Sequence, residues 1–167
     1  NGWAAGCGMV RGVDPREVVE SDLIVVWGGN PVTTQVNFMS HVARARKARD
    51  AKLVVVDVYR TPTAEAADFF IPLRPGTDGA LACAIMHVLF KKGYADRDYL
   101  AQHTDFPEGL EVHLAKRSPE WASPITGVPV EDIISLAKLY GEIKNSFIRV
   151  GYGFSRSRNG SANIHAV

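Results

Sequence analysis

The sequence has little of several features that would place it in a specialised class of proteins. Its 167 residues contain only two cysteines, Cys7 and Cys83, which form neither a metal-ligand motif nor a disulfide framework. The net charge is +1, so the chain has neither the basic surface of a nucleic-acid-binding protein nor an acidic tail. No apolar run approaches the roughly 20 residues that a membrane-spanning helix needs. We therefore expect a globular protein without nucleic-acid binding or membrane insertion.

The two ends of the chain lack the usual signals of a complete protein. Residue 1 is not methionine, no basic region is followed by an apolar one, and the last residues follow a helical pattern. A chain of this length suffices for one compact domain, so we expect residues 1–167 to be a single domain cut from a larger protein. The compartment stays open between cytoplasm and periplasm, because an export signal would lie upstream of residue 1.

Apolar runs rich in β-branched residues alternate with helical patterns along the chain. The runs cover residues 23–27, 53–56, 69–73 and 147–150, and the main helical patterns cover residues 35–49, 78–92 and 132–143. Such alternation predicts a mostly parallel sheet covered by helices on both faces, a Rossmann-like three-layer α/β/α fold. Pro72 in the third run indicates an edge strand.

The stretch from residue 95 to residue 130 is polar and carries no further strand pattern. We expect a long helical crossover here, with short helices at residues 96–103 and 108–115 and turns at Ser118-Pro119 and Thr126-Gly127.

The first strand is followed by Gly28-Gly29-Asn30-Pro31, and then by Thr33 and Thr34. In an open parallel sheet, ligands bind beyond the carboxyl ends of the strands. The two glycines permit a sharp turn and a close approach of backbone to ligand, and the threonines precede a helix whose first amides suit a phosphate. A plain strand–helix turn capped by threonine explains the same residues equally well.

The second strand ends in Asp57, with Arg60 three residues later. A carboxylate at this position of such a fold commonly accepts hydrogen bonds from a ribose hydroxyl pair, and an arginine can fork onto a phosphate. The alternative is a structural ion pair between these two side chains that holds the loop.

The third and fourth strands are also followed by polar, glycine-containing turns. Thr77 or Asp78 can cap the helix after the third strand, and the Asp78 carboxylate could accept the parallel N1–H and N2–H bonds of guanine. The turn after the fourth strand, residues 151–160, contains glycines, Arg156 and Arg158. Together the four strand ends predict a binding site for a phosphorylated nucleotide, with a purine favoured.

These segments resemble the large subunits of the dimethyl-sulfoxide-reductase family of molybdenum and tungsten enzymes. The resemblance is carried by residues 25–31, by Val55-Val56-Asp57 with the Arg60-Thr61 and Thr63-Ala64 pairs, and by Arg74-Pro75-Gly76-Thr77-Asp78-Gly79-Ala80-Leu81. Later pieces at residues 96–99, 125–129 and 151–153 fit in order and spacing, so that the match extends from about Gly12 through Asn163. The Pro-Gly-Thr-Asp turn is its most specific element.

The resemblance implies a specific cofactor and a specific set of residues. Such enzymes bind two molybdopterin guanine dinucleotides, and this chain resembles the part that grips the guanosine diphosphate end of one of them. By matching position, residues 27–34 would line pyrophosphate and ribose, residues 57–61 ribose or phosphate, and residues 76–78 the guanine. The cofactor-binding residues so implied are Trp27, Gly28, Gly29, Asn30, Pro31, Thr33, Thr34, Asp57, Tyr59, Arg60, Thr61, Gly76, Thr77, Asp78, Gly153 and Arg156.

The sequence departs from the family in what it does not contain. It has neither a cysteine cluster for an iron–sulfur centre nor an assignable ligand for molybdenum or tungsten, and we give Cys7 no such role. We therefore expect no catalytic residue and no metal ligand here, and an inactive isolated chain. The resemblance implies a parent that catalyses oxygen-atom transfer or formate-type oxidation, with its other domains and electron-transfer subunits as partners. Any iron–sulfur cluster would have its ligands outside this chain.

Two other functions compete with this interpretation. An NAD(P)-dependent dehydrogenase needs Gly-x-Gly-x-x-Gly after the first strand, whereas this chain has Gly28-Gly29-Asn30-Pro31, in which proline removes an amide needed for pyrophosphate. A non-catalytic interaction module, whose glycines and prolines are only turns, predicts no nucleotide affinity.

Overall fold

Four parallel strands form one sheet in the computed structural model, which describes residues 2–9 and 12–167, apart from the side chains of residues 5, 7 and 154. The strand order is β3-β2-β1-β4, so β1 and β2 are central. The strands are β1 (Leu23–Trp27), β2 (Lys52–Asp57), β3 (Phe69–Pro72) and β4 (Ser146–Val150). All three strand pairs are parallel, which confirms the predicted parallel sheet.

The position of each strand in the sheet follows from its composition. Every residue of β1 is buried, as are Leu53 to Val56 of β2, because continuous apolar runs suit strands covered on both faces. β3 lies at the edge, where Pro72, which has no N–H to donate, is tolerated opposite Asp57. The expectation of an edge strand is confirmed.

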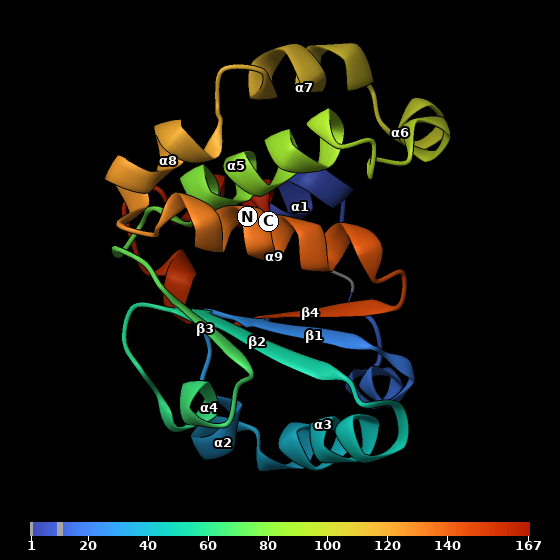
Figure 1. Ribbon diagram of the computed structural model, residues 1–167, viewed down its shortest axis with the longest axis vertical. Coiled ribbons are helices and arrows are strands. Elements are labelled where there is room, and N and C mark those ends of the chain that lie inside the picture. Colours follow the sequence, from blue (N-terminus) through green and yellow to red (C-terminus); the bar gives the residue numbers. More distant parts are fainter. Residues whose placement is uncertain (1, 10–11) are drawn as a thin grey trace.

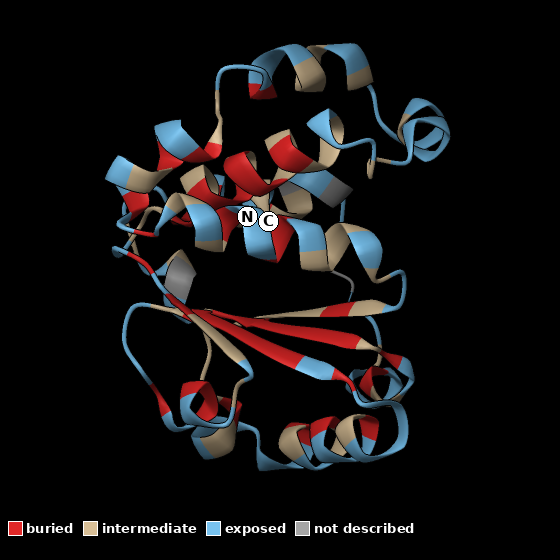
Figure 2. Ribbon diagram, in the orientation of Figure 1, coloured by how far each residue is buried: buried red, intermediate tan, exposed pale blue. Residues whose placement is uncertain are grey.

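Helices cover both faces of the sheet and give the predicted three-layer α/β/α fold (Figure 1). One layer contains α2 (Pro31–Thr34), α3 (Val36–Arg49) and α4 (Pro62–Glu65), with the 3-10 helix η1 (Pro15–Glu20) packed against α3. The opposite layer contains α5 (Asp78–Lys91), α8 (Pro119–Thr126) and α9 (Val130–Glu142). Figure 2 shows the two central strands buried between these layers.

Alternate residues of the central strands enter two separate hydrophobic clusters. Val54 and Val56 of β2 pack on the α5 and α9 side, whereas Leu53 and Val55 pack on the α3 side with Phe38. The period-two alternation of a strand therefore divides a continuous apolar run between two cores. Both clusters hold the sheet in place from opposite sides.

The crossover after α5 contains α6 (Arg97–His103), α7 (Pro107–Leu114) and α8. The first two were predicted, but α8 was not, because its two ends look like turns in the sequence. Ser118 is in fact the N-cap, whose side chain accepts from the Trp121 amide, and Gly127 is the C-cap at φ 77°. Both caps persist although Pro124 removes one internal hydrogen bond.

The first and last helices pack against each other, so that the two ends of the chain lie side by side (Figure 1). A Cβ atom at Gly2 of α1 (Gly2–Cys7) would lie 2.3 Å from the Ser161 carbonyl oxygen of α10 (Gly160–Ala166). A short 3-10 helix, η2 (Gly153–Ser155), precedes α10. No helix in the described ranges is both long and apolar enough to cross a membrane.

Truncation of one core side chain should show how strongly the sheet depends on its α3-side cluster. Val55 is fully buried in β2, so Val55→Ala should lower the free energy of unfolding by roughly 2 kcal/mol, from lost transfer energy and a cavity. Val112 in α7 is 74% exposed, and Val112→Ala should be neutral or slightly stabilising, since alanine favours helix. Urea unfolding measures both, and equal effects would contradict the assignment of Val55 to the core.

Candidate functional site

A crevice of about 1200 Å³ lies beyond the carboxyl ends of the strands, where an open parallel sheet binds ligands. Its lining comes from the loops that follow all four strands, and from the two end segments with α1 and α10. The structure thus brings together segments from Gly2 to Ile164, which is almost the full length of the chain.

Most of the residues predicted from the sequence line this crevice. They are Gly28, Gly29, Asn30, Pro31, Thr34, Asp57, Tyr59, Thr61, Gly76, Asp78, Gly153 and Arg156. Trp27, Thr33, Arg60 and Thr77 do not line it, and their side chains make other contacts, described below.

Glycines allow the loops after β1 and β4 to touch backbone to backbone at the floor of the crevice. The Gly151 amide donates to the Trp27 carbonyl at 2.7 Å, and the Gly153 amide donates to the Gly28 carbonyl at 3.1 Å. A Cβ atom at Gly151 would lie 2.1 Å from the Gly28 carbonyl oxygen, which leaves no room for a side chain. Gly28 also has a φ of 64°, a conformation that favours glycine. The floor is therefore made of backbone that a ligand can approach closely.

The loop after β1 is tied to the loop after β2 by a buried hydroxyl. Thr63 is fully buried and donates to the Asn30 side-chain oxygen at 2.7 Å, while its own oxygen accepts from the Val32 amide at 3.1 Å. Thr61 holds the same region by accepting from the Ala64 amide as the N-cap of α4. The loops after β1 and β2, which form the first two walls of the crevice, are thereby fixed relative to each other.

The threonines after β1 do not cap a long helix as one interpretation of the sequence supposed. Thr33 and Thr34 lie inside the four-residue α2, and both hydroxyls donate to the Asn30 carbonyl at 3.1 and 3.0 Å. The long helix α3 starts later, with Gln35 at its N-cap position. Pro31 at the start of α2 explains the early helical turn, because proline favours the first helical position.

Asp57 ends β2 with its carboxylate in the crevice. One oxygen accepts from the Val58 amide at 2.7 Å, and burial raises the pKa of Asp57, an effect to which the nearby Asp78 charge adds. The alternative of an Asp57–Arg60 ion pair is not found within the described part of the chain. The Arg60 guanidinium carbon lies 4.9 Å from the centroid of the Phe70 ring instead, in a cation–π contact.

Asp78 is only 3% exposed and joins three separate segments. One carboxylate oxygen accepts from the Trp27 indole nitrogen at 2.9 Å, and the other from the Asn163 amide nitrogen at 3.4 Å. Burial raises the pKa of Asp78, and the hydrogen bond from Trp27 opposes that rise. The end of β1, the start of α5 and the helix α10 therefore meet at one carboxylate.

The expected capping of α5 by a threonine hydroxyl is not what the structure shows. Thr77 occupies the N-cap position, but its hydroxyl donates to the Arg74 carbonyl at 2.7 Å and accepts nothing from the helix. An amide in the first turn of α5 is instead satisfied by a residue of α10: the side-chain oxygen of Asn163 accepts from the Gly79 amide at 3.1 Å.

Nothing in the sequence indicated the two asparagines that support residues 75–78, which form the third wall of the crevice. Asn159 donates to the Gly76 carbonyl at 2.7 Å, and Asn163 contacts both Asp78 and Gly79. No local signal distinguishes these asparagines, because their partners are more than 80 residues away in the chain. Further lining residues without a role assigned from the sequence include Trp3 of α1, Arg149 of β4 and the exposed Tyr152.

The charged side chains of the crevice are balanced in sign. Its charged lining residues are two aspartates, Asp57 and Asp78, and two arginines, Arg149 and Arg156. The described residues contain no group of three or more His, Cys, Asp or Glu side chains that could hold a metal ion. Burial raises the pKa of the Cys83 thiol, whereas the side chain of Cys7 lies outside the described part. The crevice therefore suits an organic ligand with both hydrogen-bond donors and anionic groups.

Comparison with known proteins defines the class of enzyme to which this crevice belongs. The sequence model of the molybdopterin oxidoreductase family matches residues 9–167, nearly the whole chain. The chain therefore belongs to the molybdopterin oxidoreductases, an enzyme family, which confirms the resemblance found from the sequence.

Individual relatives include both characterised and less characterised oxidoreductases. The chain is 43% identical over 99% of its length to the probable oxidoreductase YoaE of Bacillus subtilis, and 33% identical over 99% to the dimethyl sulfoxide reductase DmsA of Haemophilus influenzae. It is 34% identical over 89% of its length to the F420-dependent formate dehydrogenase 1 subunit alpha of Methanococcus maripaludis. It spans only 24%, 23% and 22% of these three relatives.

A solved structure shares the fold at low sequence identity. The acetylene hydratase from Pelobacter acetylenicus superposes with a TM-score of 0.76 at 23% identity, over 91% of this chain and 22% of that one. The α/β architecture of this chain is thus shared by a segment of a chain that is several times longer.

The buried Asp78 carboxyl should make the free energy of unfolding depend on pH. Because its pKa is raised above 3.8, the folded chain binds more protons than the unfolded one just above that pH, and the unfolding free energy falls as pH rises. Asp78→Asn removes this titration, so the unfolding free energy of the variant minus that of the wild type should rise with pH until the folded-state pKa is passed. Urea unfolding between about pH 4 and pH 8 measures the difference. If the variant-minus-wild-type difference falls with pH, folding favours the ionised form of Asp78, which would contradict the prediction. Asp98→Asn, at an exposed site in α6, is the control.

The backbone contact at the crevice floor can be tested with a single methyl group. Gly151→Ala places a Cβ atom against the Gly28 carbonyl and should lower the free energy of unfolding by about 1–3 kcal/mol or more. Gly12→Ala is the matched control, since a Cβ atom there would meet nothing within 4 Å. Urea unfolding of Gly151→Ala within about 0.5 kcal/mol of the control would contradict the contact.

Proposed function

We propose that the crevice binds the guanosine diphosphate end of a molybdopterin guanine dinucleotide, in a parent oxidoreductase of which this chain is one domain. The observation that carries the proposal is the crevice itself, with a floor of glycine backbone and two carboxylates, Asp57 at the end of β2 and Asp78 at the start of α5. The family contributes the molybdopterin cofactor. The guanine dinucleotide form is what the resemblance implies, and we propose the Asp78 carboxylate as the contact to its base.

The volume and floor of the crevice fit such a group. Pockets for small ligands commonly measure roughly 300–1,000 Å³, and about 1200 Å³ accommodates an extended nucleotide. A phosphate needs close access to amides or cations, and the contact of Gly28 with Gly151 keeps side chains away from the floor. Arg156 lines the same space and can fork onto phosphate oxygens.

The two aspartates have different tasks in this proposal. Asp57 uses one oxygen for the Val58 amide and would accept ribose hydroxyls with the other. Asp78 receives one hydrogen bond on each oxygen, which leaves about half of the roughly four acceptor sites of an ionised carboxylate. It would accept from the N1–H and N2–H groups of guanine, which adenine does not present in the same arrangement.

The task of this chain is to position the cofactor, and the cofactor supplies two-electron redox chemistry at its metal. Trp27 and Asn163 orient Asp78, and Thr63 holds the neighbouring wall through Asn30. The metal ligand and the rest of the cofactor surface would lie in other domains of the parent, and any electron-transfer subunit would be a separate chain. Its reaction is oxygen-atom transfer or a formate-type oxidation, since relatives named for both chemistries share this domain.

Titration with GDP and ADP tests the proposal and its guanine-reading residue. Asp78→Asn keeps an oxygen for Trp27 but loses the charge, so its affinity for GDP should fall about tenfold or more while that for ADP changes little. Asp57→Asn is the matched control and should weaken GDP and ADP equally, because both carry the same ribose and diphosphate. Calorimetry measures the GDP and ADP affinities of the wild type and of both variants.

Two outcomes would contradict the proposal in distinguishable ways. Equal losses of GDP and ADP affinity in Asp78→Asn would rule out guanine reading by that carboxylate. Absence of GDP binding to the wild-type chain at millimolar concentration would support a non-catalytic interaction module instead.

A further inference from the structure

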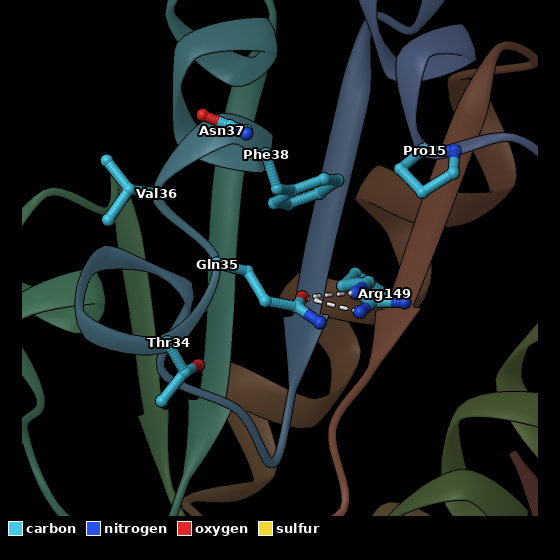
Figure 3. Close-up of a pocket in the computed structure, with 7 residues that line it drawn as sticks. All are labelled: Pro15, Thr34, Gln35, Val36, Asn37, Phe38 and Arg149. Carbon is cyan, nitrogen blue, oxygen red and sulfur yellow. Dashed lines mark hydrogen bonds between the residues drawn. The ribbon is translucent and has the colours of Figure 1, made fainter.

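A second, smaller cavity opens beside the crevice on the α3 side of the sheet. It measures about 400 Å³, and its lining includes Phe38, Gln35 and Arg149 (Figure 3). Thr34, Gln35 and Arg149 line both spaces, so the two cavities meet at these side chains. Arg149 is the one charged residue among those that line the smaller cavity.

The Arg149 guanidinium is held in place by neutral groups. Its Nε donates to the Gln35 side-chain oxygen at 3.0 Å, and Nη2 donates to the same atom. The guanidinium carbon lies 5.9 Å from the centroid of the Phe38 ring, and Figure 3 shows the Gln35 side chain reaching across to it. Within the described part of the chain, Nη1 makes no hydrogen bond and no carboxylate lies within ion-pair distance of Arg149.

Two arginines on the neighbouring helix α3 differ from Arg149 because they are neutralised by carboxylates. Arg46 and Arg49 of α3 each form an ion pair with an aspartate, Asp68 and Asp22, at 2.8 Å. Fixing a long arginine side chain in one conformation costs conformational entropy, and interactions at a surface position contribute little free energy to offset that cost. Arg149 is therefore oriented but not neutralised, with free donors directed toward the junction of the two cavities.

We propose that Arg149, oriented by Gln35, forms a subsite for a phosphate-type oxyanion at this junction. Guanidinium donors match phosphate oxygens in pairs and attract them by charge. The anion is the diphosphate of the nucleotide or a free phosphate with the same chemistry. The first source rests on the proposed function, and the second does not.

Calorimetry on the 167-residue chain with inorganic pyrophosphate, GDP and guanosine tests the subsite. Arg149→Met should weaken pyrophosphate and GDP about tenfold or more and leave guanosine unchanged, and Arg149→Lys should weaken both less. Gln35→Glu keeps the arginine but supplies an internal carboxylate, so it should cause the same selective loss. Arg44→Met removes the same charge from an exposed position of α3 and should behave as the wild type. Circular dichroism and thermal melting check that all variants fold.

Each outcome decides between the subsite and the proposed function. If Arg149→Met and Arg44→Met bind pyrophosphate and GDP alike, the subsite is wrong, although GDP binding by both would leave the proposed function standing. If pyrophosphate binding depends on Arg149 but GDP binds no tighter than pyrophosphate, the subsite holds for free phosphate and the proposed function fails. No binding of either anion to the wild-type chain would overturn both.

Discussion

The crevice depends on the contact of bare backbone between the loops that follow β1 and β4. Gly28 and Gly151 lie so close that a single Cβ atom would overlap a carbonyl oxygen, and two amide–carbonyl hydrogen bonds join the same segments. The neighbouring strands β1 and β4 are parallel, so both end at the same edge of the sheet. Beyond that edge the loops that follow them meet at glycines, so that no side chain separates the two loops. The floor is therefore glycine backbone fixed by internal hydrogen bonds and free of side chains, so that a ligand can approach it closely.

Buried polar side chains fix the walls around this floor. Asp78 joins the ends of β1, α5 and α10 through Trp27 and Asn163, and Thr63 joins the first two loops through Asn30. Burying a carboxylate is costly unless it is hydrogen-bonded, which explains both the raised pKa of Asp78 and the presence of two donors on it. The same carboxylate would thus shape the site and contact the ligand. Arg149, in contrast, is oriented by neutral groups, the Gln35 amide and the Phe38 ring, and keeps its charge available.

The strands, their parallel arrangement and the three layers could be predicted because apolar runs and helical periods are local patterns. The edge position of β3 followed from Pro72 alone. The predictions were wrong where one residue type has two uses. Ser118-Pro119 and Thr126-Gly127, expected as turns, are the two caps of α8, and the threonine at the start of α5 does not cap it. Caps and turns share the same residues, and their distinction depends on what the neighbouring chain packs against.

For this protein the sequence by itself determined the fold class, the family and the four strand-end segments of the crevice, because strand ends carry readable glycine and aspartate patterns. The part of the lining that comes from α1 was not predicted. Only the tertiary structure decided which side chains in those segments face the crevice. The Arg60 guanidinium lies over Phe70 and the Thr33 hydroxyl donates to the Asn30 carbonyl, whereas Arg149 lines the crevice from β4. Asn163 does not line the crevice but supports it by donating to Asp78. The physical reason is that a side chain's direction depends on partners far away in the sequence, and hydrogen bonds across about 50 to 85 residues leave no local pattern.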